Sequence, residues 1–518
     1  MKDAAKLIPP LDRRRFMELA GRGIGASALA ALLPGCGGGG GGGSSGGGGL
    51  GGPAIPPASA EVQALRRTSF GVSPDSLAAI NALGVEDYLE QQLNYLAIDD
   101  SAIEAAVAST FPLASQTPAQ LYPGFPNNIG DIVEDLVGAT TYRAFFSPRQ
   151  LYEVMVEFWS NHFSIHLVNG IIPALKPYDD FAVIRPNAMG TFRELLQVSA
   201  KSPAMLYYLD NFLNFVGEPQ ENYARELMEL HTLGVDGGYT EDDVKEVARC
   251  FTGWTINQVT GEFQFVPFLH DNGAKTVLGT LIPAGGGVTD GETVLDLLAS
   301  HPATANFIAT KLCRRFLSDD PPTSVIAAVE NTFNTTDGNV VEMLRTLFNS
   351  AEFAEVQDQK LARPMEFIGS LLRALNVNQT LPTDDGRLYF ALLSLLSQVP
   401  FYWVPPNGYP DVAPYWGSTS GFLNRWRIAL ALNAPVIQEY FPVDHTVAGA
   451  TNLAETIDLA AAAVLNRELA VEDRTTIIDW LVTELGVTPE QPLDPATVTA
   501  LAPFVVAMLV SSVYFQLR

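Results

Sequence analysis

Two histidines four residues apart, His162 and His166, are the first side chains whose types and spacing could support chemistry. On one helix they would share a face, as two zinc ligands do. The segment lacks the glutamate that a helical zinc protease places directly after its first histidine. His162 is therefore either a metal ligand or a buried histidine that donates to a backbone carbonyl, and both interpretations stay open.

Glu226, Glu229 and His231 form a second group, in a segment whose apolar spacing predicts a helix over 221–233. On an α-helix Glu229 lies about 60° from Glu226, whereas His231 lies about 140° away, so one helix cannot direct all three at one metal ion. Arg225 precedes Glu229 by four residues, and the two are expected to pair. The segment offers either catalytic carboxylates or an ion-pair network that orients helices.

His270 and Asp271 stand side by side in a glycine-rich segment. A histidine beside an acid can be a general base with an orienting partner, or the two can be metal ligands. Lys275 is near enough in the sequence to bind an anion there. The alternative is a plain turn, because Asp-Asn-Gly is itself a strong turn signature.

These groups define one enzymatic hypothesis, a metal-assisted hydrolase. A bound divalent ion would lower the pKa of a water molecule, and a carboxylate would act as the base. The candidate metal ligands are His162, His231 and His270, and the candidate catalytic residues are His270, Asp271, Glu226 and Glu229.

Aromatic side chains are concentrated in the proline-rich segment 399–420. Long loops within compact domains are often functional. These rings could stack on sugars or hold a peptide, or they could simply cover the core. The candidate binding residues are Trp403, Tyr409 and Trp416, together with Arg225.

Helical periodicity dominates from residue 61 onward and predicts the elements that position these side chains. Helices are expected over 75–93 with a break at Gly84, 148–163, 221–233, 292–317 with a break at Pro302, 340–348, 364–375, 388–396, 421–432 and 457–465. A further helix is expected to begin at a cap on Thr240. Long loops are expected over 111–128, 267–291 and 399–420, and the best β-hairpin candidate is 261–269. The predicted fold is mainly α: a large multi-helix domain with long irregular loops and at most a small β-hairpin.

The first 36 residues have the features of an export signal. Arg13 and Arg14, then one spacer and Phe16, resemble a twin-arginine signal. The apolar stretch that follows has about ten residues, too few to span a bilayer. Cys36 follows a small residue at its end, as at a lipoprotein processing site, so lipidation of Cys36 is expected. The alternative is ordinary signal cleavage, with Cys36 incidental.

The chain beyond the signal divides by composition. Residues 37–57 are rich in glycine and proline and predict a flexible tether. Residues 58–380 are expected to form the main helical domain. Residues 381–518 are expected to be a C-terminal helical part of the same domain, or a subdomain.

Composition excludes several classes of protein. The chain has 518 residues, 47% hydrophobic, with 31 Lys and Arg against 57 Asp and Glu, for a net charge of -26. So acidic a surface disfavours nucleic acid and anionic membranes, and membrane contact is expected only through the lipid anchor. Three cysteines exclude a disulfide scaffold. Cys250 and Cys313 are expected to pack as small hydrophobes, and they could pair only if the fold brings them within bonding distance.

Seven ordered motifs carry a resemblance to a known family. They are Ala-Leu-Arg-Arg-Thr-Ser-Phe-Gly at 64–71, Phe-Trp-Ser-Asn-His-Phe at 158–163, the segment 221–231 continuing into 234–240, Ala-Arg-Cys-Phe-Thr-Gly-Trp at 248–254, His270-Asp271 with Lys275 and Leu278-Gly279, and Arg-Pro-Met-Glu-Phe at 363–367. Together they resemble the bacterial domain-of-unknown-function 1800 family from about residue 60 to the C-terminus. The chain departs from the family pattern at Gln220, where the family tends to have Asn, and at Gly408-Tyr409, where it has Gly-Trp. The resemblance implies an exported, mainly helical protein and supplies no activity.

Two functional hypotheses follow. The first is an exported cell-envelope protein, periplasmic or at the cell surface, that binds or assembles with other exported proteins or polysaccharide. The second is the metal-assisted hydrolase, which would need a divalent metal ion. The sequence contains no nucleophile elbow, P-loop or dinucleotide fingerprint, and whether the protein is an enzyme stays open.

Overall fold

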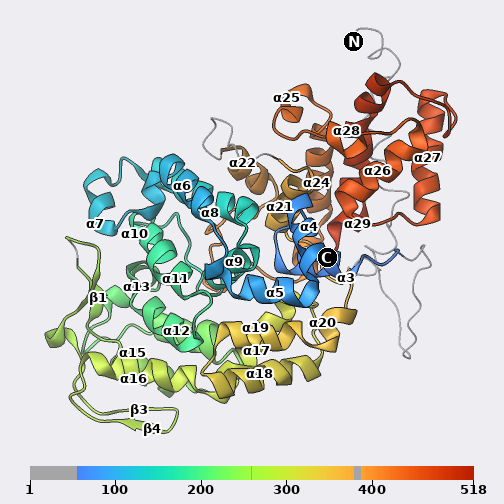
Figure 1. Cartoon of the computed structure of the whole chain (residues 1–518). Helices are drawn as coiled ribbons and strands as arrows, with labels where there is room; N and C mark the ends of the chain where they lie inside the picture. Colours follow the sequence, from blue (N-terminus) through green and yellow to red (C-terminus); the bar gives the residue numbers. More distant parts are fainter. Residues whose placement is uncertain (1–54, 258, 378–386) are drawn as a thin grey trace, which may run out of the picture.

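A computed structural model describes residues 55–257, 259–377 and 387–518. Helices dominate these residues, and the strands form two small antiparallel two-stranded sheets (Figure 1). The prediction of a mainly α fold is confirmed. The predicted signal segment with Cys36, and the glycine run after it, lie outside the described residues.

The N-terminal part packs short helices around two longer ones. Ser73 caps the helix Pro74–Leu83 through a capping box with Ser76. Gly84, with φ +85°, separates this helix from the helix Val85–Leu93, which confirms the predicted break. The predicted loop 111–128 instead contains short helical turns, because prolines start them. The elements are α3 (Ala60–Thr68), α4 (Pro74–Leu83), α5 (Val85–Leu93), η2 (Tyr95–Ala97), α6 (Ser101–Thr110), η3 (Pro112–Ser115), α7 (Pro118–Leu121), η4 (Tyr122–Gly124), α8 (Ile129–Phe146) and α9 (Gln150–His162).

The middle part contains two π-helical segments. Both are continuous with flanking α-helical turns. Such segments often occur at functional sites. The elements are α10 (Ile172–Tyr178), the π-helix η5 (Asp179–Ile184), α11 (Arg185–Asn187), α12 (Phe192–Ala200), α13 (Pro203–Tyr208), η6 (Asn211–Leu213), α14 (Asn222–Glu226), the π-helix η7 (Leu227–Thr232) and α15 (Glu241–Cys250). The predicted cap at Thr240 is confirmed, since its side chain accepts from the Asp243 amide.

Two hairpins follow α15. In the first, Trp254 pairs with Phe265, so the predicted 261–269 hairpin is the second strand of a larger hairpin that begins at residue 254. The second hairpin lies within the predicted loop 267–291 and sits beside α15 and α16 at the lower edge of Figure 1. The elements are β1 (Trp254–Ile256), β2 (Phe263–Phe265), η8 (Pro267–Leu269), β3 (Lys275–Val277) and β4 (Thr280–Ile282).

The remaining helices complete the body and a C-terminal group that gathers on one side of Figure 1 (α24 to α29). The predicted break at Pro302 is confirmed. The elements are α16 (Val288–Ala299), α17 (Pro302–Phe316), α18 (Thr323–Thr336), α19 (Val340–Phe348), α20 (Ala351–Glu355), α21 (Pro364–Ala374), α22 (Arg387–Leu395), α23 (Ala413–Trp416), α24 (Thr419–Ala431), α25 (Pro435–Gln438), η9 (Asp444–Val447), α26 (Leu453–Leu465), α27 (Val471–Leu485), α28 (Pro495–Ser511) and α29 (Val513–Gln516).

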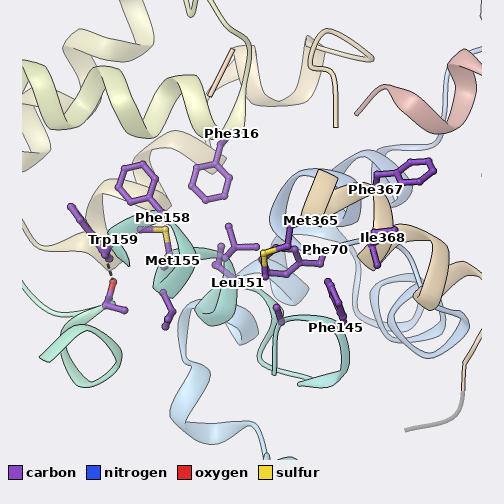
Figure 2. Close-up of a cluster of buried hydrophobic side chains, with 14 of the residues drawn as sticks. Phe70, Phe145, Leu151, Met155, Phe158, Trp159, Phe316, Met365, Phe367 and Ile368 are labelled. Atoms are coloured by element: carbon purple, nitrogen blue, oxygen red, sulfur yellow. Dashed lines mark hydrogen bonds between the residues drawn. The ribbon is translucent and has the colours of Figure 1, made fainter. Parts of the chain in front are cut away.

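One hydrophobic cluster extends from Ala58 to Leu517 and joins the C-terminal helices to the rest. The chain end also returns to the body, because Leu361 forms a β-bridge with Leu517. Figure 2 shows the centre of this core, where Trp159 of α9 donates its indole N–H to the Ala188 carbonyl at 3.0 Å. Cys250 and Cys313 are buried and unpaired, as small hydrophobes.

None of the described helices has both the length and the apolar character that a bilayer span requires.

Candidate functional site

A cavity of about 320 Å³ lies where α9, η7, α17 and the loop 407–412 meet. Its walls include His162 and Asn161 from α9, Lys311 from α17, and Tyr409 from the loop. Its size is at the lower end of the range for small-molecule sites.

The 399–416 loop is fixed to α9 by Asn161. The Asn161 side chain accepts from the Tyr409 amide at 2.7 Å and donates to the Tyr409 carbonyl at 2.9 Å. Gly408 has φ +73°, and a Cβ there would lie 2.1 Å from the Asn161 carbonyl oxygen. Only glycine permits this approach. The Tyr409 hydroxyl donates to the Val399 carbonyl at 2.9 Å, so Tyr409 is held through both its backbone and its side chain.

His162 is buried and has both ring nitrogens occupied. Its Nε2 lies 3.0 Å from the His231 carbonyl oxygen, and its Nδ1 lies 2.9 Å from Lys311 Nζ. A carbonyl only accepts, so Nε2 carries the hydrogen and Nδ1 presents a lone pair to the lysine. Burial and then the nearby Lys311 charge hold the pKa of His162 well below its usual value. His162 is therefore neutral, and it orients Lys311.

Lys311 is a half-buried residue whose amine is desolvated at the cavity wall. Burial lowers the pKa of Lys311 to about 8, while Asp411 opposes this shift and Arg314 adds a smaller effect in the same direction as burial. Its Nζ lies 5.3 Å from the centre of the Phe307 ring. Within the described part of the chain, no carboxylate lies within 4.0 Å of this nitrogen.

Three arginines extend the positive wall. Arg314 and Arg315 share a face of α17 with Lys311, at spacings of three and four residues. Arg363, at the N-cap of α21, makes a bidentate pair with Glu157 at 2.7 and 3.1 Å. Arg314 donates to the Asp319 carbonyl at 3.1 Å, and no described carboxylate pairs with it.

The wall carries more positive than negative charge. Its charged residues are the cations Lys311, Arg314, Arg315 and Arg363 and the carboxylates Glu157 and Asp411. Asp411 already lies 3.1 Å from Lys360. Arg315 is 1% exposed, and although its Nη1 lies 2.8 Å from Glu366, none of its guanidinium nitrogens makes a well-formed hydrogen bond to a described residue. A cavity with unpaired donors and excess positive charge attracts anions.

The π-helix η7 changes the predicted geometry of the Glu226, Glu229 and His231 group. The Thr232 hydroxyl donates to the Leu227 carbonyl five residues earlier, at 2.7 Å. His231 is buried within this segment, and its ring centre lies 6.1 Å from that of His162. His231 Nε2 makes no hydrogen bond to a described residue.

Glu226 and Glu229 stay partly exposed and form no catalytic pair with His231. Burial and then Glu229 raise the pKa of Glu226. The predicted Arg225–Glu229 pair is wrong, because Arg225 pairs instead with Glu241 at 2.7 and 2.8 Å. Glu229 accepts from the Tyr239 hydroxyl at 3.3 Å.

His270 lies in a separate buried cluster. Its Nδ1 lies 2.8 Å from the Thr252 carbonyl, and its Nε2 lies 3.1 Å from Asp290. The predicted His270–Asp271 dyad is wrong, because Asp271 pairs with Arg249 at 2.8 Å. Lys275 also pairs with Asp290, at 2.6 Å, and is not free to bind an anion.

The predicted metal centre does not form. Of its three histidines only His162 and His231 come together, and His270 is occupied elsewhere. Over residues 55–257, 259–377 and 387–518, no three His, Cys, Asp or Glu side chains are placed to hold a metal ion.

The aromatic residues of the loop pack mainly on one another. Ring centres lie 5.1 Å apart for Trp403 and Tyr409 and 5.8 Å apart for Tyr409 and Trp416. Trp416 is 5% exposed and donates its indole N–H to the Pro410 carbonyl. The Trp416 ring is therefore packed against the protein and leaves no ring face accessible for stacking on a ligand. Tyr409 lines the cavity, whereas Trp403 lines a neighbouring pocket of about 40 Å³.

A family model described as "Protein of unknown function (DUF1800)" matches residues 63–517. The chain belongs to the DUF1800 family. No curated protein and no solved structure matches it.

Two motifs that carried the DUF1800 resemblance build the cavity. The 158–163 motif supplies Asn161, which fixes the loop, and His162, which orients Lys311. The 363–367 motif supplies Arg363, together with Glu366, whose carboxylate lies 2.8 Å from Arg315. The hydroxyl of Tyr409 anchors the loop to the Val399 carbonyl.

The sequence analysis did not identify the lysine and arginines of the cavity wall as candidate binding residues of this DUF1800 member. The signal was present in Lys311, Arg314 and Arg315, which put three positive charges on one face of a helix in a chain of net charge -26. It also missed Asn161, whose partner lies 248 residues away.

Replacing Gly408 by alanine is expected to lower the free energy of unfolding by about 2–3 kcal/mol, because strain at positive φ adds to a clash with backbone. Urea unfolding measures this. The matched control is Gly238→Ala, at φ +82° with open space around it, which should cost about 1 kcal/mol. Equal losses at both positions would contradict the close loop contact.

Proposed function

We propose that this protein is an envelope binding protein that holds an anionic ligand in the cavity beneath the 399–416 loop. The observation that supports the proposal most strongly is the excess of positive charge on the wall of this cavity. Lys311 and Arg314 have no carboxylate partner among the described residues, and the Arg315 guanidinium lacks well-formed hydrogen bonds. A ligand anion would supply these missing acceptors.

An acidic sugar at the end or on a branch of a polysaccharide fits better than a protein segment. The cavity volume of about 320 Å³ suits a unit of small-molecule size, whereas a stable protein interface buries about 800 Å² on each partner. The wall also combines cations with the rings of Phe158, Phe307 and Tyr409. Cations select the carboxylate, and aromatic surfaces suit the apolar face of a sugar ring.

We also propose that the protein is exported by the twin-arginine route and tethered through Cys36. The support is the sequence of the signal segment and the glycine run that follows it. A tether of this composition would let the acidic body reach ligand while the lipid stays in the membrane.

Replacing the arginine pair by lysines, Arg13→Lys with Arg14→Lys, is expected to abolish export, because the twin-arginine route reads the two guanidinium groups. Fractionation of cells into cytoplasm and envelope measures it. The control is Lys2→Arg, which should leave export unchanged. Undiminished export of the double variant would contradict the proposed route.

The binding proposal is tested by calorimetric titration of the full chain with galacturonate and, separately, with neutral galactose. Binding is expected for the acid and at least about tenfold weaker for the neutral sugar, which lacks the charged acceptor. Added salt should weaken the binding of the acid. Equal affinity for the two sugars, or heat from neither, would overturn the proposal.

A further inference from the structure

The Lys311 amine has surroundings that differ from those of the other buried lysines. Lys176 pairs with Asp179, Lys275 with Asp290, and Lys360 with Asp319. Each of these three lysines thus has a carboxylate partner. Lys311 instead meets the lone pair of a neutral imidazole, Nδ1 of His162, at 2.9 Å.

Burial is what favours the uncharged amine of Lys311, since the neighbouring charges are of both signs and Asp411 has a larger effect than Arg314. Arg314 and Arg315 lie on the same helix face, and Arg363 lines the same cavity. Of the two carboxylates on the wall, Glu157 is held by Arg363 and Asp411 by Lys360. A lysine that is desolvated and close to other cations is activated as a nucleophile.

We propose that Lys311 forms an imine with the carbonyl carbon of a 2-oxo carboxylate bound in this cavity. This inference rests on the proposed anion site, because the arginines must hold the carboxylate. It specifies the ligand as an acid that carries a carbonyl beside the carboxylate, the group that the open-chain form of a 2-ulosonic acid presents and that galacturonate, with its aldehyde at the opposite end, does not.

The step balances without any other reactant. The lone pair of the neutral Nζ attacks the carbonyl carbon, and the carbonyl π electrons move to the oxygen. His162 Nδ1 passes one of the two Nζ protons to this oxygen, which gives the carbinolamine. The second Nζ proton follows by the same route and converts the hydroxyl into a leaving water molecule. The C–O bond then breaks, water leaves, and the C=N bond forms. No atom is oxidised or reduced.

The lowered pKa of Lys311, about 8, supports the nucleophile. At pH 7 such an amine has roughly a hundredfold more neutral form than an ordinary lysine. The groups that face it are His162, His231, Arg314, Arg315, Asp411 and the ring of Phe307.

Reductive trapping tests the inference. The full chain is incubated at pH 7 with pyruvate and cyanoborohydride, then digested and mapped by mass spectrometry. We expect one adduct, on Lys311, of the mass of pyruvate less one oxygen atom. Its yield should exceed that at other lysines by at least about tenfold. Acetone, which has the carbonyl but no carboxylate, should give no such selectivity.

Lys311→Arg is the matched variant, because it keeps the positive charge and removes the primary amine. It should lose the adduct, whereas the control Lys245→Arg, at an exposed lysine of α15, should keep the adduct on Lys311. Pyruvate adducts spread evenly over the lysines of the native chain would overturn the inference. No adduct in a protein that binds galacturonate would overturn the imine and leave the anion site standing. Absence of both would overturn both proposals.

Discussion

Replacing Glu366 by alanine is expected to lower the free energy of unfolding by about 3–5 kcal/mol. This carboxylate is 2% exposed and lies within 2.8, 3.0 and 3.3 Å of Arg315, Arg518 and Arg363. Burial alone would raise the pKa of Glu366, but these arginines outweigh it and hold the pKa well below its usual value. The variant would leave several buried cations without a counter-charge.

Equilibrium unfolding in urea measures this loss, and two variants isolate its cause. Glu366→Gln keeps the volume and removes the charge, so it should retain most of the loss. Glu355→Ala replaces an exposed glutamate and should change stability by less than about 0.5 kcal/mol. If the Glu366→Gln variant were as stable as the native chain, the charge of the Glu366 carboxylate would not be what stabilises its contacts with the three arginines.

Replacing Lys311 by methionine is expected to weaken binding of galacturonate by roughly ten- to a hundredfold, because a hydrogen bond to a charged group contributes about 1.5–3 kcal/mol. The native affinity should also fall as the pH rises through about 8, where Lys311 loses its proton. Below that pH the ammonium is intact and binding is strongest. Calorimetric titration from pH 6 to 9 measures both effects.

Lys245→Met is the matched control, because Lys245 is an exposed lysine paired with Asp242 on α15. It removes the same charge from the chain and should change the affinity by less than about twofold. An equal loss in both variants would mean that net charge, rather than the cavity, governs binding. An affinity that stays constant across pH 8 would show that the Lys311 ammonium does not contact the ligand.

The local elements of the fold follow from sequence, because their causes are local. Gly84 breaks a helix through its positive φ, and Thr240 starts one through its capping hydroxyl. The apolar spacing predicts a helix over 221–233, but it does not indicate that residues 227–232 are π-helical.

The candidate site depends on contacts between distant segments, which periodicity does not encode. His162 was identified as a candidate, and the interpretation that it donates to a backbone carbonyl is confirmed by its contact with His231. Its second partner, Lys311, is 149 residues away. Arg225 pairs with Glu241 and Asp271 pairs with Arg249, both on α15. These partners are 16 and 22 residues away in the sequence, so spacing within one segment does not predict them.

The most direct measurement of the anion site is anomalous diffraction from crystals of the protein soaked in selenate. We expect a selenium peak inside the cavity, within hydrogen-bond distance of Lys311 Nζ and of the Arg314 or Arg315 guanidinium. Selenium peaks confined to the outer surface, with the cavity filled by water, would contradict it.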